Sequence, residues 1–251
     1  MKPTTQTHPL FSAVVLTLFP EMFPSTLGHS LAGKALEKGI WSLQTVQIRD
    51  FATDKHKTVD AKSFGGGTGM VMKPDVIDAA VEHAKTLLPP LSHKPQASSP
   101  TIIYPSPRGI PITQPLIEKL KNEQLIVVCG RFEGVDQRVI DHHNMLEVSL
   151  GDFILSGGEI VAMAIIDACV RLLDGVIGNA CALSQESFAE QSDFARLLEY
   201  PHYTRPSFWN GKTVPEVLLS GNHAEISAWR LEQARLITQA RRPDLINKEK
   251  E

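Results

Sequence analysis

The sequence has 251 residues, of which 42% are hydrophobic and 21% charged, the composition of an ordinary soluble globular chain. A net charge of −3 and a pI of about 6.3 exclude a globally basic nucleic-acid binder, although the residues from 201 onward carry a slight excess of Lys and Arg. Three widely separated cysteines without a CxxC pair or a Cys/His cluster argue against a disulfide framework and a cysteine-based structural zinc site, and they favour a reducing compartment. No segment has the ~20 apolar residues of a membrane helix.

The first part of the chain alternates strand and helix patterns. An apolar run over 13–18 predicts a core strand that is covered on both faces, and this reading is favoured over a signal peptide. Helical spacing over 22–38 predicts a helix that ends at the following glycine, and alternation over 41–48 predicts a second strand. A long polar loop is expected over 49–70, and a helix over 75–88.

In the middle of the chain three predicted strands end in loops rich in glycine and proline. The elements predicted here are strands over 101–104, 125–129 and 146–150 and a helix over 115–121. Strands alternating with helices indicate an α/β fold with a mainly parallel sheet. The loops are Tyr104–Gly109, Gly130–Gly134 and Gly151–Gly158. Because ligands bind at the carboxyl ends of parallel strands, we expect these loops to converge on one site.

The third loop leads into a stretch, Ile160–Leu173, that reads as a helix with apolar residues almost all round. Such a helix must be covered by other elements or by a second chain. Asp167 and Arg171 lie one turn apart on a single face of it. The glycine-framed stretch before it predicts a ligand site, and a tight turn entering a core helix remains the alternative.

After Gly175 the composition changes. Small polar residues over 179–192 predict a linker, and Tyr200–Pro206 predicts a stiff turn dense in His, Tyr and Arg. A final helix is expected after Asn222 as N-cap, with Glu225 completing a capping box. The apolar side of this helix is predicted to carry Trp229, Leu231, Leu236 and Ile237. Its basic side is predicted to carry Arg230, Arg235, Arg241 and Arg242.

Three other patterns are weaker. Gly28–Lys34 fits GxxxxGK, but Ala35 lacks the hydroxyl that would hold Mg²⁺, and the segment lies inside a helical pattern. Gly65–Gly69 lacks a GxGxxG pattern and opens no helix, which disfavours a dinucleotide fold. His142 and His143, next to Asp141, have metal-binding side chains, but adjacent histidines rarely reach one ion, so a solvated loop is favoured.

Eight motifs occur in one order between Phe11 and Leu245: LFPEMF, FGGGTGM, YPSPRG, CGRFEGVDQRV, GDFILSGGE, ESFAE, PHYTRP and VLLSGNHAEI. Together they resemble the bacterial TrmD-type tRNA (guanine-N1)-methyltransferase family. The resemblance implies an α/β fold of the SPOUT type, in which a parallel-sheet domain (1–177) contains a deep trefoil knot. It also implies a flexible linker (178–192) and a small α-helical C-terminal domain that binds tRNA (193–251).

The same resemblance implies that S-adenosyl-L-methionine lies bent against the three loops. Its contacts, carried over by motif, would be Tyr104, Pro105, Ser106, Pro107, Gly130, Phe132, Glu133, Gly134, Leu150, Gly151, Asp152, Phe153, Ile154, Leu155, Gly157 and Gly158. Backbone groups exposed by glycine would hold the adenine edge, while Leu150 and Leu155 would cover its faces. Val161 replaces a proline usual in the family, and Phe132 and Phe153 stand where tyrosine is common.

For catalysis, the resemblance assigns the general base to Glu186 and the cation beside guanine O6 to Arg171. The family usually has aspartate at the position of Glu186. Asp167 is the alternative carboxylate, although an ion pair with Arg171 is the favoured role for it. The tRNA contacts implied by motif are His202, Tyr203, Thr204, Arg205, Ser220, Asn222, His223 and Arg230.

The family is a cytoplasmic obligate homodimer, with each active site between one chain's knot and the other chain's linker and C-terminal domain. Its substrate is the guanine immediately 3′ of the tRNA anticodon (position 37), preceded by another guanine. It depends on Mg²⁺, for which no ligand spacing in this sequence predicts a site. Two other functions remain as alternatives: a nucleotide-phosphate enzyme using Gly28–Lys34, and an RNA-binding protein without catalysis.

Overall fold

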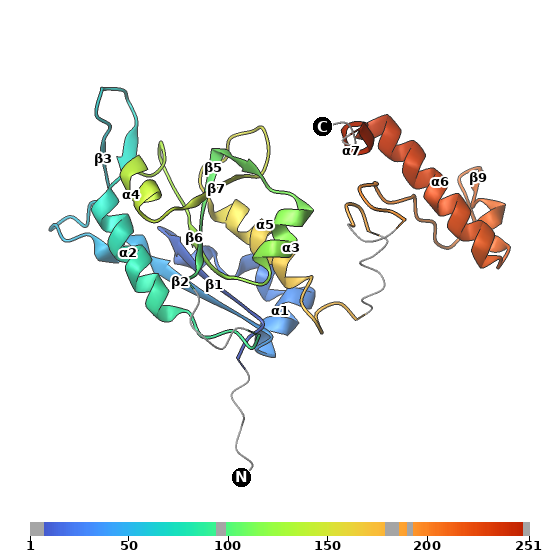
Figure 1. Cartoon of the computed structure of the whole chain (residues 1–251), viewed down its shortest axis with the longest axis horizontal. Coiled ribbons are helices and arrows are strands. Elements are labelled where there is room, and N and C mark those ends of the chain that lie inside the picture. Colours follow the sequence, from blue (N-terminus) through green and yellow to red (C-terminus); the bar gives the residue numbers. More distant parts are fainter. Residues whose placement is uncertain (1–7, 94–98, 179–185, 190–192, 248–251) are drawn as a thin grey trace, which may run out of the picture. The chain divides into compact units, whose positions relative to one another are not determined.

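The structure, a computed structural model, describes residues 8–93, 99–178, 186–189 and 193–247. The chain divides into two compact units, Met1–Gly178 and Asn179–Glu251 (Figure 1). No helix among the described residues is both long and apolar enough to cross a membrane.

The first unit is built on a five-stranded sheet in the order β2-β1-β6-β5-β7, in which all neighbouring strands are parallel. Its strands are β1 (Phe11–Thr17), β2 (Trp41–Gln47), β5 (Thr101–Pro111), β6 (Gln124–Val128) and β7 (Leu146–Ser149). Every residue of β1 and β6 is buried, as expected for strands whose central residues are all apolar. The predicted α/β parallel-sheet class is therefore confirmed.

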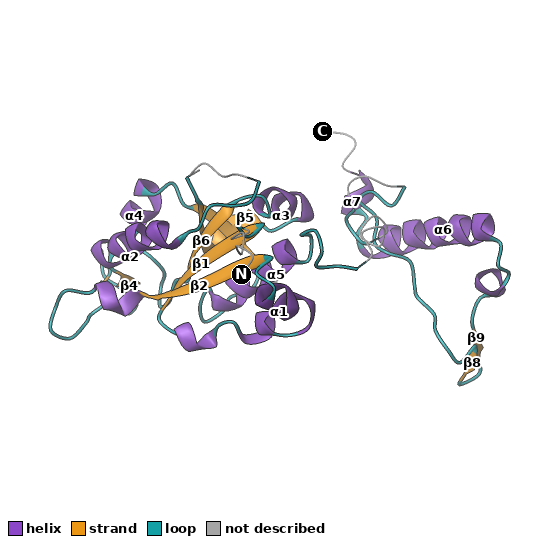
Figure 2. Cartoon of the chain, turned by 90° about the horizontal axis from the view of Figure 1, so that it is seen from below, coloured by secondary structure: helices purple, strands orange, loops and turns teal. Residues whose placement is uncertain are grey.

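Five helices cover this sheet: α1 (Ser30–Glu37), α2 (Pro74–Leu87), α3 (Gln114–Leu120), α4 (Gln137–His142) and α5 (Glu159–Val170). Helices α2 and α4 lie on one side of the sheet, and α1, α3 and α5 on the other (Figure 2). A large core cluster joins Val14 and Leu16 of β1 to Ile77 and Val81 of α2. The sheet is thus a rigid middle layer whose carboxyl edge is left to loops.

Several local predictions for this unit were wrong. The expected helix over 22–38 is interrupted: short 3₁₀ helices occupy Pro20–Met22 and Ser25–Gly28 before α1 begins. Pro24 lies within the predicted span, where proline removes a helical donor and clashes with the preceding turn. The predicted stop holds, since Gly39 follows the helix with a φ of +70°.

The long loop expected over 49–70 also contains regular structure. A 3₁₀ helix covers Ile48–Phe51, and β3 (Asp60–Lys62) pairs antiparallel with β4 (Met70–Met72). Helix α4 was not predicted, and β5 continues to Pro111 instead of ending at Tyr104. The described chain is therefore more regular around the predicted site than its glycines and prolines suggested.

The second unit contains the long helix α6 (His223–Arg241), the short α7 (Asp244–Asn247), a 3₁₀ helix over Glu216–Leu219 and the hairpin β8 (Phe208–Trp209) with β9 (Lys212–Thr213). Asn222 is the predicted N-cap, since its side chain accepts from the amides of Ala224 and Glu225. Ser220 Oγ, in place of the expected Glu225 carboxylate, accepts from the Asn222 amide at 3.1 Å.

The sides of α6 also differ from the prediction. Leu236, expected on the apolar side, is half exposed, whereas Ala234 and Thr238 are buried. Thr238 Oγ1 donates to the Ala234 carbonyl and accepts from the Leu198 amide, both at hydrogen-bond distance. Most of the predicted linker, 179–185 and 190–192, lies outside the described residues. The assignment of 1–177, 178–192 and 193–251 to catalytic domain, linker and tRNA-binding domain stays a prediction.

Candidate functional site

The carboxyl ends of β5, β6 and β7 open on a cavity of about 760 Å³, a volume suited to a cofactor-sized ligand. All of the predicted cofactor-binding residues line it except Asp152, so the three loops do converge in space. Asp152 is exposed, and the ring of Phe153 folds back over Gly151 beside it. Val161 also lines the cavity.

The first wall belongs to the far half of β5. Its pairing with β7 shifts register between Pro105 and Ile110, a bulge that accommodates prolines without breaking the strand. Tyr104 is buried beneath this wall, and its phenol oxygen accepts a hydrogen bond from the Val135 amide at 3.2 Å. Burial raises the pKa of the Tyr104 phenol, so this hydroxyl stays protonated.

The second wall, Gly130–Gly134, is held by the β3–β4 hairpin. The Met72 amide donates to the Gly134 carbonyl at 2.8 Å, and the Glu133 amide donates to the Met70 carbonyl at 2.9 Å. Gly134 has a φ of +111°, and a Cβ there would lie 2.6 Å from the Tyr104 phenol oxygen. Only glycine satisfies both constraints.

The third wall, Leu150–Gly158, presents apolar side chains to the opening. Phe153 is 54% exposed and Ile154 is 78% exposed, which is unusual for large apolar residues outside a binding surface. The Gly158 amide donates to the Gly130 carbonyl at 3.2 Å, which joins this wall to the second. The result is a cavity with apolar faces and backbone polar groups at its corners.

Arg131 also lines the cavity, although it was not among the predicted site residues. Arg131 connects the second and third walls: its guanidinium pairs with the Glu159 carboxylate at 2.9 Å and donates to the Ser156 carbonyl at 3.2 Å. Glu159 is 1% exposed and also accepts from Thr17 Oγ1 at 2.8 Å. The position inside the CGRFEG motif was the signal that could have identified Arg131.

Further charged side chains at the cavity were not among the predicted cofactor contacts. Lys62 belongs to the hairpin, Arg108 pairs with Glu147 at 3.1 Å, and Arg138 pairs with Asp136 at 2.9 Å. The hydrogen bonds from Arg138 lower the pKa of the Asp136 carboxyl. The cavity therefore carries charges of both signs, in contrast to the uniformly basic pocket expected for a phosphate-rich ligand.

The predicted catalytic cation, Arg171, follows the end of α5. It is half-buried, and its amide donates to the Asp167 carbonyl at 3.0 Å, while the side chain of Asp167 is exposed. Among the ion pairs formed by the described residues none joins these two side chains, so that expectation is not met. Helix α5 is mostly buried by its own unit, although Ile160 is 53% exposed.

The remaining predicted residues belong to the second unit. Glu186 is half-buried, and its carbonyl accepts from the Ala189 amide at 3.3 Å. Of the predicted tRNA contacts only Arg230 is half-buried: its guanidinium lies over the Tyr200 ring, 4.9 Å from the centroid, so it is not part of a solvated basic face. The others are exposed: His202, Tyr203, Thr204, Arg205, Ser220, Asn222 and His223.

The GxxxxGK segment does not form a phosphate loop. Gly28 ends a 3₁₀ helix and Lys34 lies within α1, so no strand leads into the segment. A Cβ on Gly33 would overlap the Gly28 carbonyl, which gives both glycines a packing role. The nucleotide-phosphate alternative therefore has no structural support.

Comparisons with known proteins agree on one family. Residues 11–248 match the sequence profile described as tRNA (Guanine-1)-methyltransferase TrmD. A tRNA (guanine-N(1)-)-methyltransferase of Rickettsia akari is 54% identical over 238 residues, covering 94% of this chain and 98% of that protein. The protein of the same name from Rhodospirillum rubrum is 55% identical, covering 93% of this chain and 91% of the relative. The protein of the same name from Mesorhizobium japonicum is 54% identical, covering 94% of this chain and 96% of the relative.

Proposed function

Because this chain belongs to the tRNA (guanine-N1)-methyltransferase family, we propose that it transfers a methyl group from S-adenosylmethionine to N1 of a guanine in tRNA. The observation that carries the proposal is the convergence of three distant loops on one cavity of about 760 Å³. The substrate guanine in this proposal is the one immediately 3′ of the anticodon, preceded by a second guanine, as the sequence resemblance implies.

The cavity fits the methyl donor on chemical grounds. S-adenosylmethionine supplies a methyl group on a sulfonium centre and carries an adenine, an ammonium and a carboxylate. Apolar side chains of Leu150 and Leu155 suit the faces of the adenine, and backbone groups at Gly130 and Gly134 suit its polar edge. Charges of both signs around Lys62 and Glu133 suit the zwitterionic end.

Proton removal is the chemical task left to the protein. Guanine N1 carries a proton and is a poor nucleophile until that proton leaves, and a carboxylate within hydrogen-bond distance can accept it. Glu186 is the proposed base, one methylene longer than the family's usual aspartate. Arg171 is the proposed cation, which would stabilise the negative charge that develops on O6 as N1 is deprotonated. In-line alignment of N1 with the methyl group contributes through positioning.

The exposed residues of the second unit support a tRNA-binding role. His202, Tyr203 and Arg205 lie together in one exposed segment, and aromatic or guanidinium planes stack on unpaired bases. The amino end of α6, with Ser220 and His223 beside it, suits a phosphate. Positioning of the flipped guanine over the donor then depends on the partner chain, since the proposal includes a homodimer whose active sites form at the subunit interface.

The trefoil knot is also part of the proposal. The strand order supports it: after β5 the chain passes to β6 on one side and then to β7 on the other. After β7 the chain must return across β5 and β6. The Gly158 amide donates a hydrogen bond to the Gly130 carbonyl after β6, and Thr17 of β1 donates one to the Glu159 carboxylate. A cytoplasmic location follows from the tRNA substrate.

Magnesium is implied by the family, but no site for it is assigned. Among the described residues, Asp78, His142 and His143 form a group of three potential metal ligands. This group combines one carboxylate with two imidazoles, whereas Mg²⁺ prefers an all-oxygen shell. No catalytic step is therefore assigned to this ion.

The test is methyl transfer with radiolabelled S-adenosylmethionine to two tRNA transcripts that differ only in the guanine that precedes the target. We expect label at N1 of the target guanine in the transcript with two adjacent guanines, and much less in the other. Labelled product that stops reverse transcription at this position confirms the site of methylation. Tight tRNA binding without donor binding to the cavity would instead favour the RNA-binding alternative.

A further inference from the structure

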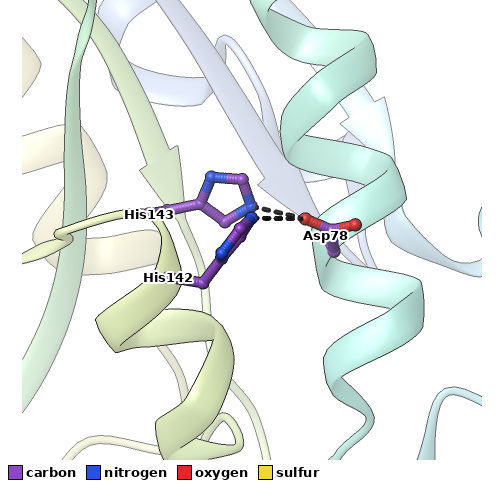
Figure 3. Close-up of side chains that lie close together, drawn as sticks. All are labelled: Asp78, His142 and His143. Atoms are coloured by element: carbon purple, nitrogen blue, oxygen red, sulfur yellow. Dashed lines mark hydrogen bonds and ion pairs between the residues drawn. The ribbon is translucent and has the colours of Figure 1, made fainter.

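Two histidines at the end of α4 converge on one carboxylate of α2, outside the donor cavity (Figure 3). His143 Nε2 lies 2.7 Å from Asp78 Oδ1, and His142 Nε2 lies 3.9 Å from the same oxygen. The three ligand atoms are all within 4.8 Å of one another. We propose that Asp78, His142 and His143 bind a late first-row divalent metal ion, with Zn²⁺ the best match.

The backbone explains how adjacent histidines reach one point. In a regular helix consecutive side chains diverge by about 100°. Here His142 is the last residue of α4, and His143 caps it with φ −91° and ψ 3°, so the chain leaves helical geometry at His143, although the His143 amide still donates to the Val139 carbonyl. Their rings meet edge to face, with centroids 4.8 Å apart, and both Nε2 atoms face Asp78. The sequence-based interpretation as a solvated loop is therefore wrong for His143, whose side chain is 3% exposed.

The surroundings match those of a protein metal site. The second ring nitrogen of His143, Nδ1, lies 3.8 Å from Glu82 Oε1, so a carboxylate that could orient a metal-bound imidazole is nearby but beyond hydrogen-bond distance. Glu82 is in turn paired with Lys85 at 2.6 Å. His142 is 70% exposed and, with Asp78, lines a small cavity of about 250 Å³, which leaves room for a water molecule as fourth ligand.

The distances fit an ion after a small adjustment. Zinc with bonds of about 2.0–2.1 Å in a tetrahedral shell places its ligand atoms roughly 3.3 Å apart. The observed separations of 2.7 and 3.9 Å lie on either side of that value. An ion bound to both atoms would replace the proton that His143 Nε2 and Asp78 Oδ1 share, move these atoms apart and draw in the exposed His142. Two imidazoles and one carboxylate favour Zn²⁺, Co²⁺ or Ni²⁺ over Mg²⁺.

Such an ion would strengthen the link between α2 and α4, which are already joined by the hydrogen bond between Asp78 and His143. Gln137 and Arg138, in the first turn of α4, line the donor cavity, and His142 ends the same helix. The metal would fix the far end of the helix that starts at the cavity wall. Its role would be structural, separate from the methyl-transfer chemistry.

The experiment uses untagged full-length protein that has been treated with a chelator and dialysed. Isothermal titration with ZnCl₂ and the visible absorption of added Co²⁺ both report binding without reference to activity. We expect one tightly bound ion per chain, a higher melting temperature with Zn²⁺, and no displacement by excess MgCl₂. In His142→Ala, an exposed change compatible with folding, and in Asp78→Asn, zinc affinity should fall at least tenfold.

The control is His56→Ala, which removes an exposed histidine outside the cluster and should leave the titration unchanged. Equal zinc affinity in wild type and His142→Ala, or no zinc binding in wild type, would overturn the proposal. Equal losses in His142→Ala and His56→Ala would do the same, because they would show binding at scattered surface histidines.

Discussion

Arg131 and Glu159 form a two-point ion pair, with Nε 3.2 Å from Oε1 and Nη2 2.9 Å from Oε2, in which the carboxylate is almost completely buried. The same guanidinium packs over the Phe19 ring at 4.6 Å. This pair fastens the start of α5 to the loop after β6, and therefore fixes two of the three cavity walls relative to each other.

Removing the Arg131 guanidinium should lower the free energy of unfolding. Arg131→Met leaves the Glu159 carboxylate buried with Thr17 as its remaining partner, and breaking a buried pair from one side typically costs about 3–5 kcal/mol. We expect a loss of that order in urea unfolding, and at least tenfold weaker binding of S-adenosylmethionine by calorimetry. Lys121→Met, which breaks a surface pair with Glu118, is the control and should cost about 0.5 kcal/mol or less. Wild-type donor affinity in a folded Arg131→Met protein would contradict this role.

Gly134 provides a second test of the cavity walls. Gly134→Ala places a methyl group against the Tyr104 phenol in a backbone conformation with φ +111°. We expect donor affinity to fall at least tenfold, because the second wall must move. Gly39→Ala is the matched control: it has φ +70° but open space around it, so it should cost only about 1–2 kcal/mol of backbone strain and leave donor binding intact.

For Glu186, the prediction separates chemistry from binding. Glu186→Gln keeps the shape of the side chain but cannot accept the N1 proton, so kcat should fall roughly 10²–10⁴-fold while donor affinity stays unchanged. Glu186→Asp, which introduces the residue that the sequence resemblance leads us to expect at this position, should retain most activity. Single-turnover methylation measures the rate of methyl transfer, and calorimetry measures the affinity for S-adenosylmethionine. If Glu186→Gln transfers methyl groups at the wild-type rate, then Asp167 is the next carboxylate to test, as Asp167→Asn.

The cysteines of the first unit should be inert in the native protein. Burial raises the pKa of Cys169 to about 12 and that of Cys129 well above its usual value, with Glu159 adding to the latter effect. The thiolate is the reactive form, so alkylation at pH 8 should be negligible until the protein unfolds. Mass spectrometry of iodoacetamide-treated Cys181→Ser protein, native and in guanidinium, tests this. Rapid labelling of either remaining cysteine in the native state would contradict it.

The sheet and the cavity could be predicted because their signals are local. Uninterrupted apolar runs such as Leu125–Val128 have few structures available other than a buried strand, and glycine-rich corners after such runs lie at one edge of a parallel sheet. Pairing between elements far apart in the sequence produces no comparable pattern. Asp78 and His143 are therefore neighbours that only the packing of α2 on α4 reveals.

Some missed features did have a signal. Asn210-Gly211 between Phe208-Trp209 and Lys212-Thr213 is the usual two-residue hairpin turn, and both turn residues have positive φ. The helix predicted over 22–38 is interrupted because the prediction followed the apolar spacing and gave too little weight to Pro24 within the span. Arg230 was placed with the other arginines on the basic side of the helix because helical spacing does not show that Tyr200, thirty positions earlier, covers it.

The bond between Gly158 and Gly130 has a consequence for how this protein is made. Strand β6 pairs with β1, more than a hundred positions earlier, and the last wall of the cavity closes only when Gly158 has emerged from the ribosome. A nascent chain that ends before this point has no complete donor pocket. Methyl donor in the cell can therefore not assist the early stages of synthesis, and it protects only chains whose first unit is already assembled.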